Sequence, residues 1–378
     1  MDPPGLNKPH ILFLYSDTGG GHRAAAEAII EAIGLEYPGQ VTTEMVDIFL
    51  RYAPPPINLA PRIYPRLSRM PNVWEMGYRA SDGRRRTRFA YRMLWPYVRR
   101  SLQRLMVNHP ASLIVSVHQM INTPVARIAH AYGIPFVTVV TDLVSTHAAW
   151  YSPSADLVIV PTQAAFDRGL AMHMPAERMQ VVGQPVADRF CLPPGDRVAL
   201  RKELGWQLDQ LTAILVGGGE GMGPMAATAF AIDAARLPMQ LVIVTGRNKE
   251  LRMQLEQHPW QIPVHIYGFV TDMPDFMRAS DVLISKAGPG TISEAFIAGL
   301  PVILYSKMPG QEDGNVDFVV AEGAGVWAPQ PHQAVATLRI WLDQPETRAA
   351  ASANALRLAR PDASRRIARL LVQIAARS

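Results

Sequence analysis

The chain has 378 residues, a net charge of +5 and a composition that is 48% hydrophobic and 18% charged, so it is long enough for two or three domains. No apolar run approaches the roughly 20 residues of a membrane-spanning helix, and the single cysteine, Cys191, excludes an intrachain disulfide or a cysteine metal cluster. Residues 1–10 contain no apolar segment of the signal-peptide kind, so we expect a cytoplasmic protein.

The N-terminal half alternates short apolar runs with helical stretches. Residues 11–15 are predicted to form the first strand, which leads through a glycine-rich turn into an alanine-rich helix over residues 23–33. Further strands are predicted at residues 41–49, 112–117, 136–141, 157–160 and 181–183. Strands that are separated by helices favour a parallel sheet with helices on both faces.

An arginine-rich segment interrupts this pattern. Residues 51–104 contain 13 arginines, no lysine, two acidic residues and eight aromatics, so the segment carries +11 while the remainder of the chain carries −6. Arginine interleaved with aromatics fits an anionic surface with an apolar interior. Nucleic acid would match the charge, and an ordinary solvated helix face is the other alternative. The predicted partners are anionic membrane lipids and no nucleic acid, with the protein peripheral on the inner face of the cell membrane. The predicted membrane-binding residues are Arg84, Arg85, Arg86 and Arg88.

The strand pattern restarts after residues 191–195 (CLPPG), whose composition is typical of a linker. The second series of strands is predicted at residues 211–216, 241–245, 265–267, 282–285 and 302–305. The domains are therefore predicted at residues 1–190 and 195–358, each a doubly wound α/β fold. Because ligands bind beyond the carboxyl ends of such strands, the expected site is a cleft between the two domains.

Each predicted domain opens with a glycine-rich turn, at residues 19–22 (GGGH) and 217–223 (GGGEGMG). A strand, a glycine turn and a helix N-terminus together make an anion site. The first turn also fits the dinucleotide pattern G-x-G-x-x-A, with Asp47 near the end of the next strand, so an NAD-type oxidoreductase is an alternative. The second turn does not fit, because Met222 and Pro224 occupy the third small position in its two registers.

Two more polar segments follow predicted strands of the second domain. Residues 285–291 (SKAGPGT) precede a helix in which Thr291 and Glu294 have capping-box spacing and Gly299 is placed as the helix stop. Residues 309–315 (PGQEDGN) form a polar loop, which can offer donors and acceptors to sugar hydroxyls. A plain surface turn is the alternative for this loop.

Taken together, these segments resemble the monogalactosyldiacylglycerol synthases. The segments that carry the resemblance are GGGHR (19–23), SVH (116–118), FVTVVTDL (136–143), GGGEGMGP (217–224), GRNK (246–249), KAGPGTISE (286–294) and PGQEDGN (309–315). They cover nearly the whole chain in order, and residues 51–104 diverge. The resemblance implies a GT-B fold with two Rossmann-like domains facing a cleft, the donor in the second domain and the acceptor in the first. It also implies that a last helix, at about residues 360–378, packs back on the first domain.

The implied activity is inverting transfer of galactose from UDP-galactose to diacylglycerol, by a UDP-sugar-dependent hexosyltransferase. A diacylglycerol glucosyltransferase that uses UDP-glucose is the nearest alternative, because the motifs do not distinguish one hydroxyl epimer. A non-catalytic protein that binds anionic lipids is a third alternative, against which the intact donor motif argues. No metal or other cofactor is expected, because glycine-loop amides and a helix N-terminus can stabilise the leaving diphosphate.

The resemblance also implies roles for single residues. His22 matches the general base, and its place at a predicted helix N-terminus would keep the imidazole neutral. His118 and His147 follow predicted strands and are weaker base candidates, on the acceptor side of the cleft with Gly20 and Gly21. The implied donor residues are Gly218, Gly219, Gly290 and Thr291 at the diphosphate, Phe269 at the uracil edge, Glu294 at the ribose, Gln311 and Glu312 at the hexose, and Asn315 as a support of that loop.

Overall fold

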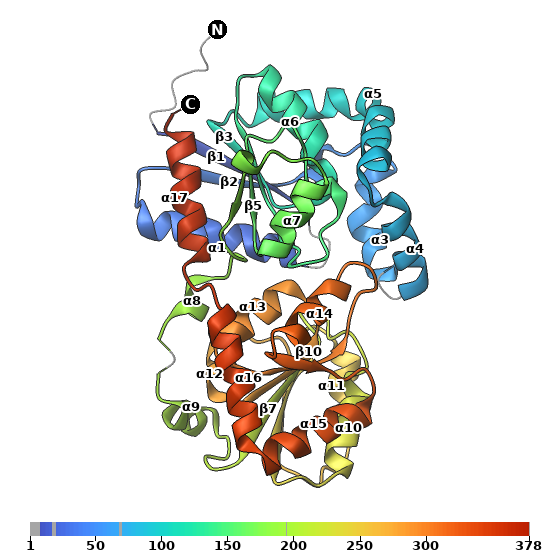
Figure 1. Cartoon of the computed structure of the whole chain (residues 1–378), viewed down its shortest axis with the longest axis vertical. Coiled ribbons are helices and arrows are strands. Elements are labelled where there is room, and N and C mark those ends of the chain that lie inside the picture. Colours follow the sequence, from blue (N-terminus) through green and yellow to red (C-terminus); the bar gives the residue numbers. More distant parts are fainter. Residues whose placement is uncertain (1–7, 17–19, 68–69, 194, 378) are drawn as a thin grey trace. The chain divides into compact units, whose positions relative to one another are not determined.

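The computed structural model describes residues 8–16, 20–67, 70–193 and 195–377 (Figure 1). The chain divides into two compact units. The N-terminal unit comprises Met1–Asp188, Pro309–Gln311 and Asp362–Ser378, and the C-terminal unit comprises Arg189–Met308 and Glu312–Pro361. Each unit is built on a six-stranded sheet whose neighbouring strands are parallel. The predicted α/β class with two doubly wound sheets is confirmed.

The sheet of the N-terminal unit has the strand order β2-β1-β3-β4-β5-β6. Its strands are β1 (His10–Tyr15), β2 (Thr42–Asp47), β3 (Leu113–Ser116), β4 (Phe136–Val139), β5 (Leu157–Val160) and β6 (Met179–Val181). Its helices are α1 (Gly21–Glu36), α2 (Ile48–Tyr52), α3 (Ala60–Leu67), α4 (Pro71–Ser81), α5 (Arg84–Asn108), α6 (Asn122–Ala131), α7 (Gln163–Ala171) and α17 (Ala363–Ala375). Four single turns of 3₁₀-helix are η1 (Ile57–Leu59), η2 (Gln119–Ile121), η3 (Ala148–Trp150) and η4 (Ala176–Arg178).

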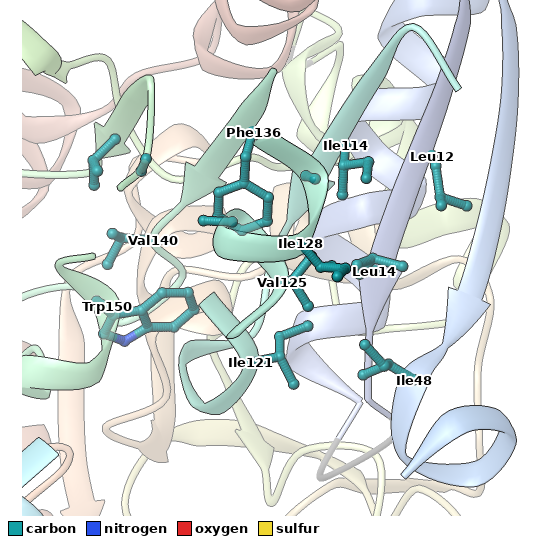
Figure 2. Close-up of a cluster of buried hydrophobic side chains, with 14 of the residues drawn as sticks. Leu12, Leu14, Ile48, Ile114, Ile121, Val125, Ile128, Phe136, Val140 and Trp150 are labelled. Carbon is teal, nitrogen blue, oxygen red and sulfur yellow. The ribbon is translucent and has the colours of Figure 1, made fainter. Parts of the chain in front are cut away.

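Strand β1 shows how this sheet is buried on both faces. Successive side chains of a strand point to opposite faces. Ile11 and Phe13 join a core with α1 and α17 on one face, while Leu12 and Leu14 join a core with α5 and α6 on the other. Figure 2 shows the second core, in which Trp150 packs below the strands. The continuous apolar run of β1 therefore follows from burial on two sides.

Helix α17 belongs to the N-terminal unit, although it lies at the far end of the sequence. It packs along α1, and its residues Ile367 and Leu371 are fully buried. The Ser364 hydroxyl donates to the Val186 carbonyl (2.7 Å) and accepts from the Val186 amide (3.0 Å). These contacts join residues that are 178 positions apart.

The sheet of the C-terminal unit has the order β12-β11-β10-β7-β8-β9. Its strands are β7 (Leu211–Val216), β8 (Met239–Val244), β9 (Val264–Tyr267), β10 (Val282–Lys286), β11 (Val302–Ser306) and β12 (Gly325–Trp327). Its helices are α9 (Arg197–Leu204), α10 (Met225–Ala234), α11 (Lys249–Glu256), α12 (Met273–Ala279), α13 (Pro289–Ile297), α14 (Asp313–Ala321), α15 (Pro331–Asp343) and α16 (Pro345–Leu358). The short helix α8 (Asp188–Cys191) stands at the junction of the two units, and Pro194 of the predicted linker lies outside the described residues.

The arginine-rich segment folds into α3, α4 and the 25-residue helix α5, which continues through Pro96. The end of α5 is held in the core by Leu102, Leu105 and Met106. Its first half is mostly exposed, with Phe89 and Met93 about two-thirds accessible. Among the described residues, no helix combines the length and the apolar character that crossing a bilayer requires.

Candidate active site

The first glycine turn leads into α1, which begins at Gly21. Gly20 is the N-cap residue and has a φ of +75°, a left-handed conformation that glycine adopts without steric cost. Gly19 lies outside the described residues. Gly20 and Gly21 thus lead the chain from the carboxyl end of β1 into the helix, and His22 stands in the first helical turn.

His22 is half-buried beside groups that follow two other strands. Its Nδ1 atom lies 2.8 Å from Thr141 Oγ1, and its ring centroid lies 4.6 Å from that of His118. Burial lowers the pKa of His22 from 6.5 to about 4, and a hydrogen bond with the Val117 backbone opposes this change. The imidazole is therefore neutral at physiological pH, as a general base requires.

His118 lies next to His22 but is buried more deeply. Only 3% of His118 is exposed, and burial, with His22 as a second cause, holds its pKa well below the usual range. Its Nδ1 atom accepts a long hydrogen bond (3.4 Å) from the Met120 amide. The structure thus brings two of the three predicted histidines together.

His147 lies in a different cluster of the N-terminal unit. Its Nε2 atom is 3.2 Å from the Ser81 hydroxyl and 4.0 Å from an Asp82 oxygen. The same Asp82 accepts from Arg168 (2.7 Å) and from the Ala148 amide (2.8 Å). These contacts connect the turn between α4 and α5 to the loop that follows β4. His147 therefore borders the arginine-rich helices.

Asp142 is a buried carboxylate near His22 that sequence analysis did not select. It accepts from the Trp150 indole N–H at 2.6 Å and from the Gln311 amide at 3.0 Å. Trp150 is fully buried, with its ring 6.1 Å from that of His22. The signal was present in the segment FVTVVTDL, which contains both Thr141 and Asp142. Gln311 packs with the N-terminal unit, and its predicted contact with the hexose stays a prediction.

The four predicted membrane-binding arginines begin α5, and all are exposed. Two of them, Arg84 and Arg88, also line a cavity of about 670 Å³ between α5, α6 and the loop after η3. Arg92 and Arg127 extend its cationic wall, and Arg127 stacks 4.1 Å from the Trp95 ring. The segment therefore presents a hollow lined with guanidinium groups as well as a charged surface.

In the C-terminal unit, the second glycine turn follows β7. Gly218, Gly221 and Gly223 all have positive φ. The Tyr305 hydroxyl lies 3.0 Å from the carbonyl oxygens of both Val216 and Met222, at the two ends of the turn. The turn is therefore fixed from β11 before any ligand binds.

Lys286, at the end of β10, is a second residue that sequence analysis did not select. A Cβ atom added to Gly218 would lie 3.6 Å from its Cε atom, and one added to Gly288 would lie 3.5 Å from its Nζ atom. Its ammonium group thus lies between the two glycine segments of this unit. Lys286 Nζ donates to Glu312 Oε1 at 2.9 Å, and Glu312 also accepts from the Met308 amide (2.7 Å).

Helix α13 begins at Pro289, after the N-cap Gly288, without a side-chain cap. The capping box that was predicted for Thr291 and Glu294 is wrong, because proline at the first helical position starts the helix three residues earlier, with Gly288 as the N-cap. Gly290 and Thr291 therefore belong to the first turn, whose N–H groups have no intrahelical partner. Gly299 ends the helix with a φ of +69°, as predicted.

Glu294 and Asn315 have different environments in this unit. Burial raises the pKa of Glu294 from 4.5 to about 7, and the charge of Arg189 opposes this change. The Asn315 amide donates to the Ala287 carbonyl at 2.9 Å. Asn315 thus ties α14 to the chain that leads into α13.

Phe269 lies in the loop after β9, and its side chain is 58% exposed. The Arg247 guanidinium stacks 4.7 Å from its ring centroid and also binds Glu220 at 2.9 Å. A Cβ atom at Gly219 would lie 3.4 Å from Arg247. Phe269, Arg247 and the glycine turn are therefore neighbours. Within the described ranges, no group of three or more His, Cys, Asp or Glu side chains is placed to hold a metal ion, and metal independence stays a prediction.

Two Rossmann-like units, one with a histidine at a helix N-terminus and one with glycine turns beside a helix N-terminus, have the architecture of the GT-B class of glycosyltransferases. Two solved structures show the same fold. Acinetobacter baumannii MurG has a TM-score of 0.62 and 16% identity over 97% of this chain and 99% of its own. The MnaA-UDP co-structure from S. aureus has a TM-score of 0.63 and 14% identity over 95% of this chain and 94% of its own.

Sequence comparison defines the family. The model for monogalactosyldiacylglycerol (MGDG) synthase matches residues 22–186, and that for the glycosyltransferase family 28 C-terminal domain matches residues 215–367. The chain is 38% identical to a probable monogalactosyldiacylglycerol synthase of Nicotiana tabacum and 35% identical to monogalactosyldiacylglycerol synthase 1 of Arabidopsis thaliana. Each match covers 93% of this chain and 68% of the relative. The chain belongs to the monogalactosyldiacylglycerol synthase family, which confirms the resemblance.

One expectation is wrong by this comparison. The charge pattern and the N-terminal residues predicted a cytoplasmic protein on the inner face of the cell membrane. The relatives from N. tabacum and A. thaliana are both named as chloroplastic proteins. Membrane charge is shared by several compartments, so an arginine-rich segment does not identify one of them.

Proposed function

We propose that this chain transfers galactose from UDP-galactose to diacylglycerol, with inversion at the anomeric carbon. Relatives named as monogalactosyldiacylglycerol synthases support the acceptor and the sugar. A protein of the same fold was solved with UDP, which supports the nucleotide. The observation that carries the proposal is His22, a neutral imidazole beside Thr141 at the N-terminus of α1.

In the proposed reaction, His22 takes the proton of the glycerol hydroxyl as its oxygen attacks the anomeric carbon. The bond from that carbon to the β-phosphate oxygen breaks, and its electron pair leaves with UDP. The products are β-galactosyl diacylglycerol, UDP and a protonated His22, which returns its proton to solvent. A single displacement of this kind inverts the anomeric configuration.

The leaving diphosphate needs positive potential, which the C-terminal unit can supply. Backbone N–H groups at Gly218 and Gly219 and in the first turn of α13 would bind its oxygens. Lys286, which is paired with Glu312, would add a further ammonium donor between these two segments. We place the ribose at Glu294, the uracil edge at the Phe269 backbone and the hexose at Gln311 and Glu312. Because these groups stabilise the developing charge, we expect turnover to persist in EDTA.

We further propose that α5 and the cavity beside it bind anionic lipid. The support is the density of exposed arginines at the start of α5 and the guanidinium-lined hollow of about 670 Å³. Each arginine near an anionic surface contributes about 1 kcal/mol. Four contacts give about 4 kcal/mol, close to a thousandfold in partitioning. Exposed Phe89 and Met93 would add apolar contact with the interface.

The docking test neutralises Arg84, Arg85, Arg86 and Arg88 together. Sedimentation with phosphatidylcholine vesicles, with or without phosphatidylglycerol, is followed across a salt series. We expect the variant to lose most binding to the anionic vesicles and most of its salt dependence. The matched control neutralises four exposed arginines outside the segment, namely Arg339, Arg357, Arg360 and Arg377. If both variants lost vesicle binding equally, the segment would be an ordinary charged surface with no special role in membrane binding.

The central test incubates the protein with UDP-galactose or UDP-glucose over diacylglycerol vesicles and identifies the lipid products. We expect β-galactosyl diacylglycerol from UDP-galactose. Glucosyl diacylglycerol as the main product would instead assign the glucosyl branch. Tight binding of NAD without binding of UDP would instead support the alternative of an NAD-type oxidoreductase.

A further inference from the structure

Thr141, His118 and His22 each follow one of three neighbouring strands in the same sheet. His22 follows β1, His118 follows β3 and Thr141 follows β4, and these strands are adjacent in the order β1-β3-β4. Because the carboxyl ends of parallel strands share one edge, the fold brings together residues that are 119 positions apart. Only 3% of Thr141 is exposed, so water does not compete well for its contact with His22.

A catalytic histidine needs a defined tautomer. A neutral imidazole has one N–H and one lone pair, and the hydrogen bond made by one nitrogen decides which role the other takes. In many enzymes a carboxylate makes this bond. Among the described residues, the side chain that hydrogen-bonds to His22 is the Thr141 hydroxyl, at 2.8 Å from Nδ1.

We propose that Thr141 is the positioning residue of His22. The Nδ1–H group donates to Thr141 Oγ1, which leaves the Nε2 lone pair to receive the proton of the acceptor hydroxyl. The neighbouring rings of His118 and Trp150, with centroids at 4.6 and 6.1 Å, restrict the rotation of the imidazole. The catalytic part of this inference rests on the proposed transferase function, while the tautomer does not.

Thr141→Val tests the inference, because valine keeps the shape of threonine and removes the hydroxyl. Thr138→Val is a matched control. Thr138 lies on β4, three residues earlier, and its buried hydroxyl has no hydrogen-bond partner among the described residues. Both substitutions replace a buried threonine of the same region, but only the first removes a contact with His22. Thr141→Ser should restore the contact.

The first measurement is two-bond ¹H–¹⁵N spectroscopy of protein with ¹⁵N-labelled histidine, with the His22 signals assigned by their loss in His22→Gln. We expect the Nδ1–H tautomer in the wild type, in Thr141→Ser and in Thr138→Val. We expect a shift toward the Nε2–H tautomer in Thr141→Val. An Nε2–H tautomer in the wild type, with its proton directed at the Val117 backbone, would overturn the inference. This measurement tests the tautomer of His22 even if the protein transfers no galactose.

The second measurement is turnover at saturating UDP-galactose. General-base catalysis contributes about 10²–10⁴-fold, so loss of the correct tautomer should lower kcat at least about tenfold in Thr141→Val. UDP affinity and the KM for UDP-galactose should not change, and Thr141→Ser should regain most of the rate. Wild-type kcat in Thr141→Val, or an equal loss in Thr138→Val, would contradict a positioning role. An inactive wild type would instead contradict the proposed function.

Discussion

The connection from β1 into α1 and the connection from β10 into α13 each end in a glycine N-cap residue but lie beside different side chains. Each follows a buried parallel strand and ends at a helix N-terminus with positive potential. At α1 the side chain in this field is an imidazole, which burial keeps neutral. At α13 it is the Lys286–Glu312 ion pair with Glu294 nearby in the sequence. Both helix ends supply positive potential, and we infer that the side chain beside each end determines whether it serves the proposed proton transfer or the proposed anion binding.

Of the changes that test this comparison, removal of His22 should have the largest effect on turnover. His22→Ala is expected to lower kcat by about 10²–10⁴-fold, because no base remains to accept the acceptor proton. UDP affinity, measured by calorimetry, should survive, because the proposed nucleotide site lies in the other unit. Near-normal turnover would show that another group is the base, and His118 would then be the next residue to replace.

Removing Glu294 should affect only the nucleotide site proposed at the connection from β10 into α13. We expect Glu294→Ala to weaken UDP about tenfold to a hundredfold, because hydrogen bonds to a charged group contribute about 1.5–3 kcal/mol. Glu294→Gln keeps the volume and serves as the matched variant, and thermal unfolding reports any change in folding. Unchanged UDP affinity in both variants would remove the ribose assignment.

The hexose contacts should produce a smaller and more selective effect. Gln311→Ala and Glu312→Ala are each expected to weaken UDP-galactose about tenfold, which corresponds to one hydrogen bond of about 1.4 kcal/mol. Gln311→Ala should have a slight effect on UDP alone, and Glu312→Ala should not weaken UDP, because it frees Lys286 for the diphosphate. Calorimetry with the two ligands separates these cases. If each variant loses equal affinity for UDP and for UDP-galactose, the residues do not contact the sugar.

The dependence of kcat on pH should be the smallest of these effects over the pH range in which enzymes are usually assayed. A base acts in its neutral form, and burial lowers the pKa of His22 to about 4, so the base form persists above that pH. At pH 5 about 90% of His22 would be neutral, compared with about 3% at an unshifted pKa of 6.5. The kcat at saturating UDP-galactose should therefore hold from pH 8 to pH 5 and fall below about pH 4. Because UDP-galactose is saturating, a change in donor affinity caused by the titration of Glu294 does not affect the measured kcat. A fall in kcat centred near pH 6.5 would contradict the buried environment of His22.

The strands were largely predictable because burial on both faces leaves short continuous apolar runs. Two local errors have physical causes. Residues 48–49 were assigned to the second strand, but Asp47 accepts from the Leu50 amide at 2.9 Å and starts α2 at Ile48. The three-residue strand β12 was not predicted, because so short an edge strand has no periodic pattern.

The site was less predictable than the fold, because its contacts join distant residues. The glycine turns and His22 carry local signals, whereas the pairing of Lys286 with Glu312 spans 26 positions and that of His22 with Thr141 spans 119. His147 was expected in the same cleft as the other histidines because it follows a predicted strand. The loop after β4 instead carries it to Asp82 at the turn between α4 and α5.

The packing of α17 on α1 has a consequence for how the chain is made. Arg365 of α17 binds Glu36 at the end of α1, 329 positions earlier. A ribosome must therefore synthesise the chain as far as α17 before the apolar face of α1 can be covered. The C-terminal sheet is complete by then, so the first sheet to emerge from the exit tunnel is the last to finish its core. Until that moment Ile29 and Ile33 of α1 lack Ile367 and Leu371 as neighbours, so the nascent N-terminal unit exposes apolar surface of the kind that chaperones bind.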